Sequence, residues 1–259
     1  MKFVPVPITG WPTDKQRVLF SGWDTRIQDY AVFSRENGHA WIRTELEQGP
    51  THPVVNVSWD EAQAFCAWLT ESERKQVAQT AVSALKGRAT SIVHVGHTST
   101  KVAIELAQHA ESVGADMISS VPPIYYPVGP EGVMLHYRSI AESVSLPVLV
   151  YNIPGATGTI LSDDLWLELF KIPTIIGMKY TGADLYYMRN MIELLGEQAL
   201  VLAGSDEMFL PSLVMGCDGS IGSTQNVAPE WFVRIREAYL AGDLKTAQKL
   251  QFEVNHFIK

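Results

Sequence analysis

The sequence predicts an α/β protein, namely an incomplete or patched (β/α)8 TIM-type barrel with six clear βα units, preceded by a Trp-rich irregular α+β segment. From about residue 90, short apolar strand patterns alternate with helix patterns, which is typical of a covered parallel sheet. Their spacing fits βα units of a closed barrel, which needs eight of them. A doubly wound open sheet is the rival fold, but no GxGxxG motif follows a first strand.

The composition narrows the class of protein. The chain has 259 residues, of which 46% are apolar, so it can bury a sizeable core in one large or two smaller domains. A net charge of −8 argues against a general nucleic-acid binder. We find no signal peptide and no apolar run long enough to span a bilayer. We therefore expect a cytoplasmic protein without a membrane or nucleic-acid partner.

The first sixty residues have their own pattern. They contain four of the seven tryptophans, scattered Pro and Gly, and no helical periodicity. We expect short strands and loops here, with strand patterns in "RVLFSGW" and "PVVNVSW". Asp60 then marks the N-cap or first turn of a long helix, "DEAQAFCAWLTESERKQVAQTAVSAL".

The rest of the chain alternates strands and helices. Helix patterns such as 101–114 and 161–170 separate the strands, and an amphipathic helix over 243–259 is expected to pack on the barrel or on a partner subunit. The six predicted strands are "SIVHVG", "ADMISSV", "LPVLVY", "TIIGMK", "ALVLAG" and "GSIGS".

Six units leave two places of a barrel unfilled. The stretch 53–59 has strand-then-helix order, so we predict that it pairs with residues 91–96 and fills the place before them. The alternative is a separate Trp-rich subdomain beside an incomplete barrel.

The carboxyl ends of the predicted strands carry the candidate chemistry, because reactive residues gather there in parallel βα folds. An amine at a dry strand end loses solvation, which lowers its pKa and frees the neutral nucleophile. Such a lysine forms an imine with a ketone, and a phenol such as Tyr151 can transfer the proton in metal-free aldol chemistry. The alternative for Lys179 is a strand-capping lysine that extends to solvent. The strand ends hold Tyr125, Tyr126, Tyr151, Lys179, Gly204 to Glu207, and Ser223 with Thr224.

Two other features allow competing interpretations. Asp206 and Glu207 are predicted to open a helix, where acids suit the macrodipole, and also to accept hydrogen bonds from sugar hydroxyls. His94 and His97 flank a strand end, but without an acidic or cysteine partner nearby we expect no metal there.

Three stretches carry a family resemblance: "YNIPGATG" (151–158), "GMKYTGADLYYM" (177–188) and "GSDEMFLPSLVMGCDGSIGSTQN" (204–226). From about residue 72 onward the chain resembles the N-acetylneuraminate lyases of the dihydrodipicolinate synthase superfamily of Schiff-base aldolases. The resemblance implies a lyase that cleaves or forms a C–C bond in a 2-oxo sugar acid and releases pyruvate. It also implies a covalent imine without a cofactor, and a homo-oligomer.

The same resemblance assigns roles to residues. It makes Lys179 the imine lysine, Tyr151 the proton-transfer tyrosine, and Tyr125 the aromatic that completes the proton relay. The implied substrate-binding residues are Thr181, Gly204, Ser205, Asp206, Glu207 and Ser223. Ala156 stands where the synthase branch has arginine, which disfavours a dicarboxylate substrate. Ser205 and Gln225 each stand where some lyases have tyrosine, which leaves the exact sugar acid open.

Residues 3–70 resemble a different family, the formylglycine-generating, sulfatase-modifying enzymes, through "VLFSGWDTRIQDYAVF" and "GPTHPVVNVSWDEAQAFCAWLT". Nothing here matches that family's reactive cysteine pair, and Cys66 lies in a helix pattern where we expect a core residue. We therefore predict two domains, 1–70 and 71–259, joined within the helix near residues 69–77. Cys217 is the other cysteine, and two are too few for a disulfide framework.

The join leaves out part of the lyase pattern. The "GSTGE"-type loop that the resemblance assigns to the substrate carboxylate has no counterpart here, and Ala62 and Gln63 stand near its hydroxyl positions. We therefore expect an aldolase with weak or no turnover. The alternatives are an inactive recombined chain that acts as a binding or interaction protein and, more remotely, a sulfatase-modifying relative.

Overall fold

The computed structural model describes residues 3–7, 17–21, 27–38, 50, 54, 57–124 and 128–259. The chain divides into two compact units, Met1–Gln76 and Val77–Lys259. The boundary between them lies inside helix α2, Trp59–Leu85. The assignment of the first unit to a family of its own stays a prediction.

The first unit has a hairpin and an aromatic cluster. Strands β1 (Phe3–Pro7) and β2 (Arg17–Ser21) pair antiparallel, and β2 coincides with the predicted strand in "RVLFSGW". Helix α1, Ile27–Glu36, was not predicted, and it corrects the expectation of strands and loops alone. Its buried residues Ile27, Tyr30 and Phe33 recur every third position, which is a helical signal. Tyr30 and Phe33 pack on Phe65 of α2 with ring centroids 5.5 and 5.7 Å from it.

Helix α2 begins with a reciprocal capping box. The Ser58 N–H donates to the Glu61 carboxylate at 2.7 Å, and the Glu61 N–H donates to Ser58 Oγ at 3.2 Å. Ser58 is thus the cap, and Asp60 is the predicted first-turn acid. The predicted strand over 53–59 is wrong at its described positions, because Val54, Val57 and Ser58 lie outside any strand and Trp59 is helical.

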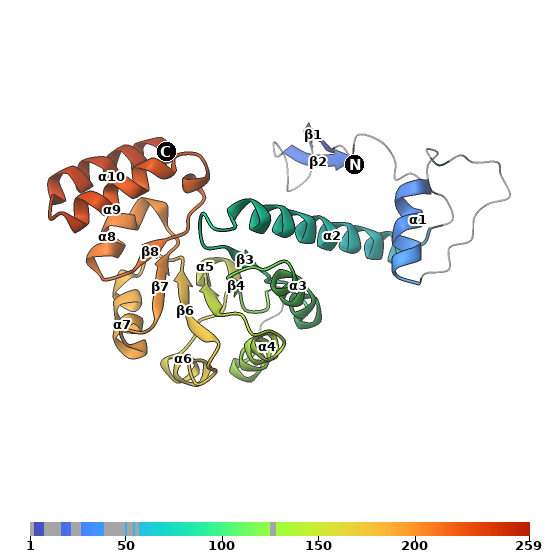
Figure 1. Cartoon of the computed structure of the whole chain (residues 1–259), viewed down its shortest axis with the longest axis horizontal. Helices are drawn as coiled ribbons and strands as arrows, with labels where there is room; N and C mark the ends of the chain where they lie inside the picture. The colour runs from blue at the N-terminus through green and yellow to red at the C-terminus, as the bar shows by residue number, and fades with distance from the viewer. Residues whose placement is uncertain are drawn as a thin grey trace. The chain divides into compact units, whose positions relative to one another are not determined.

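The second unit is built on a curled parallel sheet of six strands in chain order (Figure 1). All six predicted strands are present, as β3 (Ile92–His94), β4 (Met117–Ser120), β5 (Val148–Asn152), β6 (Ile175–Tyr180), β7 (Leu200–Ala203) and β8 (Gly219–Ser220). Within the described part of the chain, β3 pairs only with β4, and β8 pairs only with β7. The predicted pairing of 53–59 with 91–96 is therefore not seen at the described residues.

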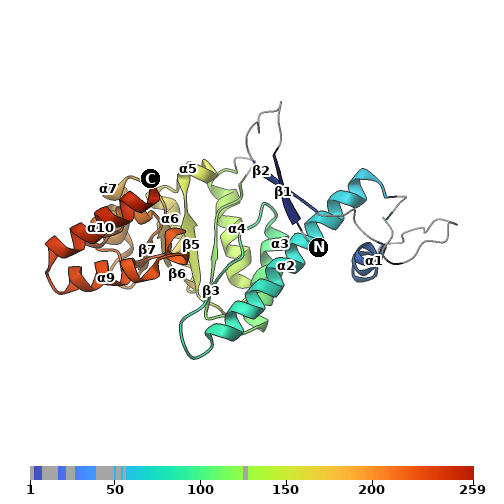
Figure 2. The ribbon, with the colours of Figure 1, turned by 90° about the horizontal axis from the view of Figure 1, so that it is seen from above.

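Helices cover one side of this sheet. Helices α3, α4, α6 and α7 follow one another around it in Figure 1, while α9 and α10 pack against each other beyond β8. Figure 2 shows the same sheet from above. The helices of this unit are α3 (Thr100–Ser112), α4 (Pro130–Glu142), α5 (Pro154–Thr157), α6 (Asp163–Leu169), α7 (Leu185–Leu195), α8 (Phe209–Val214), α9 (Pro229–Leu240) and α10 (Leu244–Ile258), with 3₁₀ turns η1 (Asp206–Met208) and η2 (Thr224–Asn226).

The core lies between sheet and helices. Val148, Val150 and Met178 are fully buried on the helix-facing side and belong to one continuous apolar cluster with Trp166 of α6. Side chains alternate between the faces of a strand, so Tyr151 and Lys179 project from the opposite face, where both are half-buried. No helix in the described ranges has the length and apolar character needed to cross a membrane.

Candidate active site at the carboxyl ends of the strands

Lys179 and Tyr151 lie side by side near the ends of neighbouring strands. They are register partners in the β5–β6 ladder, so their side chains leave the same face of the sheet. The Lys179 Nζ atom stands 4.0 Å from the centroid of the Tyr151 ring, which is a cation–π contact. The structure thus brings the predicted amine and phenol together, with the amine over the ring face.

Thr181 and Gly204 lie against this contact, just after β6 and β7 respectively. Thr181 follows β6, and its Oγ1 donates to the Tyr151 hydroxyl at 3.4 Å. Gly204 follows β7, and its N–H donates to the Tyr180 carbonyl at 2.7 Å. A Cβ atom on Gly204 would lie 1.8 Å from Thr181 Oγ1 and 3.0 Å from Lys179 Cε. Only glycine fits there without moving both neighbours.

Asp206 links the end of β7 to the loop after β8. It opens η1, which continues into α8, so the predicted helix start is present as a 3₁₀ turn. Its carboxylate is buried and accepts hydrogen bonds from the Thr224 N–H at 2.7 Å and from Gln225 Nε2 at 3.1 Å. A Cβ on Gly222 would lie 1.7 Å from Asp206 Oδ1, so the loop approaches the carboxylate closely. The Glu207 side chain, in contrast, is exposed.

The other predicted site residues are placed less informatively. Ser205 immediately precedes η1, and the exposed Ser223 immediately precedes η2, so both follow strand ends on the Lys179 side of the sheet. Tyr125 and Tyr126 lie outside the described residues. The side chain of Cys66 does too, whereas Cys217 is buried.

Gln251 of α10 supports the site but was missed in the sequence. Its side chain is 3% exposed, its Nε2 donates to the Asp206 carbonyl at 3.0 Å, and its Oε1 accepts from the Leu210 N–H at 2.8 Å. The signal for it is an amide among the buried positions Ala247, Leu250 and Val254 of an amphipathic helix. A buried amide at such a position needs polar partners, and here they are backbone groups of η1 and α8 together with the Asn255 side chain.

His94 also lies at this rim, although the sequence suggested it only as a doubtful metal ligand. Its ring centroid is 5.8 Å from that of Tyr151 in a T-shaped arrangement, and its Nδ1 is 3.2 Å from Ser119 Oγ. His97 instead accepts a hydrogen bond from the Ser99 N–H at 3.0 Å. Among the described residues there is no group of three or more His, Cys, Asp or Glu side chains that could hold a metal ion.

A hydrogen-bonded layer lies behind the rim, on the helix side. The Tyr187 hydroxyl accepts from Trp166 Nε1 at 2.8 Å and from Asn152 Nδ2 at 3.1 Å, and donates to the Leu161 carbonyl at 3.3 Å. Burial raises the pKa of Tyr187. This network ties β5, next to Tyr151, to α6 and α7.

His136 forms a second buried polar link. Its Nδ1 is 2.8 Å from Thr100 Oγ1, and its Nε2 is 3.3 Å from Ser120 Oγ at the end of β4. Burial lowers the pKa of His136 to about 4, so the imidazole is neutral at pH 7. It therefore joins α3 and α4 to β4 as an uncharged group.

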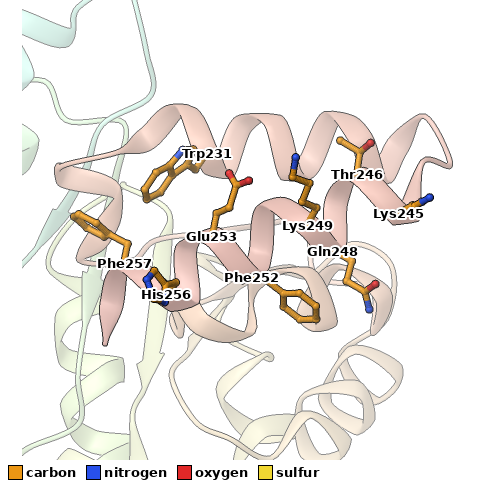
Figure 3. Close-up of a pocket in the computed structure, with 9 residues that line it drawn as sticks. All are labelled: Trp231, Lys245, Thr246, Gln248, Lys249, Phe252, Glu253, His256 and Phe257. Atoms are coloured by element: carbon orange, nitrogen blue, oxygen red, sulfur yellow. The ribbon is translucent and has the colours of Figure 1, made fainter.

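An open groove of about 990 Å³ lies elsewhere, on the surface of α9 and α10 (Figure 3). Trp231 and Phe257 meet edge to face along it, with ring centroids 5.3 Å apart. None of the predicted site residues lines it, so we place the candidate site at the strand ends and not in this groove.

The sequence matches the dihydrodipicolinate synthetase family over residues 35–259. The chain belongs to this family. An N-acetylneuraminate lyase of Rhizobium meliloti is 37% identical over 187 residues, which cover 72% of this chain and 62% of the relative. A 4-hydroxy-tetrahydrodipicolinate synthase of Methanopyrus kandleri is equally similar, with 37% identity and the same coverage.

Solved structures show the same relationship. CdNal from Clostridium difficile, solved in complex with mannosamine, has a TM-score of 0.71 and 35% identity, and the match covers 78% of this chain and 69% of that one. The chain thus spans less than two thirds of the length of the first two curated relatives. The family match begins at residue 35, inside the segment that resembles sulfatase-modifying enzymes, and that second resemblance stays a prediction.

Proposed function

We propose that this protein is a Schiff-base aldolase of the N-acetylneuraminate lyase type, which cleaves or forms a C–C bond in a 2-oxo sugar acid. One observation carries the proposal: in a member of this family, the Lys179 amine lies 4.0 Å from the Tyr151 ring centroid at the carboxyl ends of β5 and β6. An amine and a phenol at this distance supply the nucleophile and the proton carrier that imine chemistry needs.

The proposed cleavage runs through the lysine. The Lys179 amine attacks the C2 ketone, and the Tyr151 hydroxyl donates the proton with which water leaves, so that a protonated imine and the Tyr151 phenolate form. The phenolate takes the proton from the C4 hydroxyl; the C3–C4 bond breaks, its electron pair moves toward the iminium, and an aldehyde leaves. The Tyr151 hydroxyl protonates the resulting enamine at C3, and water hydrolyses the imine to release pyruvate and the free amine while its proton returns to Tyr151. The Thr181 hydroxyl, 3.4 Å from that of Tyr151, orients the phenol during these steps.

The rim also offers groups for the sugar chain. We propose that the exposed Glu207 and Ser223, together with Ser205, contact the hydroxyl groups of the substrate. Asp206 acts indirectly, because both of its carboxylate oxygens already hold the 224–225 loop. Tyr125 keeps its proposed place in the proton relay on the family resemblance alone.

We propose weak turnover for this chain. The sequence has no counterpart of the glycine-and-hydroxyl loop that the resemblance assigns to the substrate carboxylate. By analogy with the removal of an oxyanion-hole donor, losing one preorganised donor costs about 2.7–4 kcal/mol, or roughly a hundred- to a thousandfold in rate.

Borohydride trapping with pyruvate tests the lysine directly. Purified protein is incubated with pyruvate and reduced, and the adduct is located by intact-mass and peptide mass spectrometry. We expect one adduct on Lys179, its loss in Lys179→Ala, and its retention in Lys171→Ala, which removes an exposed lysine paired with Glu168. The proposal fails if wild-type protein forms no adduct, or if Lys179→Ala labels as well as wild type.

A second candidate is a binding or interaction protein that keeps the lysine pocket without turnover. It is favoured by the sheet, which has two edge strands, β3 and β8, in the described part of the chain instead of closing. Pyruvate release from N-acetylneuraminate, with Lys179→Ala as control, separates the two candidates. The aldolase releases pyruvate, whereas the binding protein would be trapped with pyruvate by borohydride but would release none from N-acetylneuraminate. Homo-oligomerisation and a cytoplasmic location stay predictions.

A further inference from the structure

We propose that the exposed face of α10 binds the same face of a second copy of this chain, in an antiparallel arrangement around a two-fold axis. This face borders the open groove of about 990 Å³, where Trp231 of α9 and Phe257 of α10 meet edge to face (Figure 3). None of the proposed catalytic residues lines the groove, so the inference is independent of the imine chemistry.

Helix α10 has two opposite faces. One face is buried and consists of Ala247, Leu250, Gln251 and Val254. The other carries Phe252 and Phe257, which are 61% and 53% exposed. The outer face of a helix that packs on one side only is ordinarily polar. Two exposed phenylalanine rings beside a groove are instead typical of a surface that contacts a partner.

The charges on the exposed face are separated along the helix. Lys245 and Lys249 come first, and Glu253 follows one turn after Lys249. All three side chains are exposed, and no ion pair joins Lys249 to Glu253 in the part of the chain that the structure describes. An antiparallel second copy sets each Lys249 against the Glu253 of the other copy, whereas a parallel copy sets like charges against each other. The order of the charges therefore favours an antiparallel pair of identical faces.

The same register brings the exposed phenylalanines together. Lys249, Phe252 and Glu253 are spaced i, i+3 and i+4, so they lie on one face of α10. The two-fold axis passes midway between Lys249 and Glu253, about 3 Å along the helix from each. Phe252 lies about 1.5 Å along the helix from that midpoint, so the two copies of its ring meet at the axis. One register thus gives an aromatic centre flanked by two ion pairs, which is the usual anatomy of a protein interface.

Two single charge reversals on the full chain test this arrangement. Lys249→Glu and Glu253→Lys each set like charges against each other in a symmetric pair, so each variant alone should raise the dimer Kd about ten- to a hundredfold. An equimolar mixture of the two variants should dimerise as wild type does, because every contact between positions 249 and 253 then joins opposite charges. The doubly reversed chain, Lys249→Glu with Glu253→Lys, should also behave as wild type. Sedimentation velocity over a range of protein concentrations measures each Kd.

Replacing Phe252 tests the aromatic centre. Because its side chain is 61% exposed, Phe252→Ser leaves the core intact, and it should raise the dimer Kd about tenfold or more. Tyr186→Ser is the matched control, since this ring on α7 is 75% exposed and lies outside the proposed face. The control should dimerise as wild type does, and circular dichroism checks the fold of each variant.

Three outcomes would overturn the proposal. Wild-type protein could stay monomeric up to about 1 mM, the weak end of specific affinities. A dimer could form whose Kd neither Phe252→Ser nor the charge reversals change, which would place the contact on another surface. The reversals could also weaken the dimer without rescue in the mixture, which would exclude the antiparallel register. Borohydride trapping on Lys179 is measured separately, so none of these outcomes decides the proposed function.

Discussion

Replacing Gly204 with alanine is expected to slow imine formation strongly without unfolding the protein. The added Cβ would lie 1.8 Å from Thr181 Oγ1, 2.9 Å from Thr181 Cβ and 3.0 Å from Lys179 Cε. Ordinary contacts of a Cβ begin at 3.4 Å. The threonine must therefore move by more than 1 Å, and the lysine stem must move with it.

The size of the effect follows from this displacement. A misplacement of about 1 Å in a catalytic group can cost a hundredfold in rate. Because Thr181 also contacts the Tyr151 hydroxyl, the clash disturbs the amine and the phenol together. We expect the rate of pyruvate trapping in Gly204→Ala to fall by about a hundredfold or more.

Gly219, at the start of β8, provides the control. Among the described residues, a Cβ on Gly219 would meet only Leu202 Cδ2 at 3.6 Å, which is ordinary van der Waals contact. Gly219→Ala should therefore trap pyruvate at a rate close to wild type. Trapping rates from intact mass and unfolding curves in urea are measured on both variants. A Gly204→Ala protein that is folded and traps at the wild-type rate would refute the placement of Thr181 and Lys179 against this glycine.

Three further predictions concern stability. Gln251→Leu leaves the Leu210 N–H without its acceptor, whereas the Asp206 carbonyl keeps the N–H of Phe209. The free energy of unfolding in urea should therefore fall by about 1–3 kcal/mol, and an unchanged midpoint would contradict the link. Tyr187→Phe removes the acceptor of Trp166 Nε1 and Asn152 Nδ2 and should cost a similar amount; a neutral outcome would show that these donors find other partners. For His136, a folded pKa of about 4 against 6.5 in the unfolded chain means that protons bind the unfolded state first as pH falls. Wild type should therefore lose about 2 kcal/mol of unfolding free energy between pH 7 and pH 5 that His136→Gln does not lose, and parallel pH curves would contradict this.

The strands of the second unit could be predicted because each is a short apolar run ended by turn residues. Their parallel arrangement in one sheet could also be predicted, because strands that alternate with helices indicate a parallel sheet. Lys179 and Tyr151 were placed together by the rule that strand ends meet at one rim, and the structure shows their contact. The role of each in chemistry stays a prediction.

Other features could not be predicted because they depend on tertiary contacts. Among its described side chains, helix α1 has three buried residues spaced for a helix, which is a weak signal amid the Pro and Gly around it. The stretch 53–59 has strand composition, but the capping box at Ser58 starts a helix within it. His94 and Gln251 take their places from partners 57 and 45 residues away in the chain, which no local pattern indicates.

The geometry of the rim explains how lysine chemistry and a six-stranded sheet are compatible. Tyr151 and Lys179 are register partners on adjacent strands. Thr181 directly follows β6, the strand of Lys179, and Gly204 directly follows the neighbouring strand β7. Each contact in this set is made between neighbouring strands from β5 to β7, so it needs no closed barrel. The carboxylate of a substrate, in contrast, has to be held by a group outside this set. Imine formation and turnover should therefore separate in this protein, with the first surviving where the second is weak.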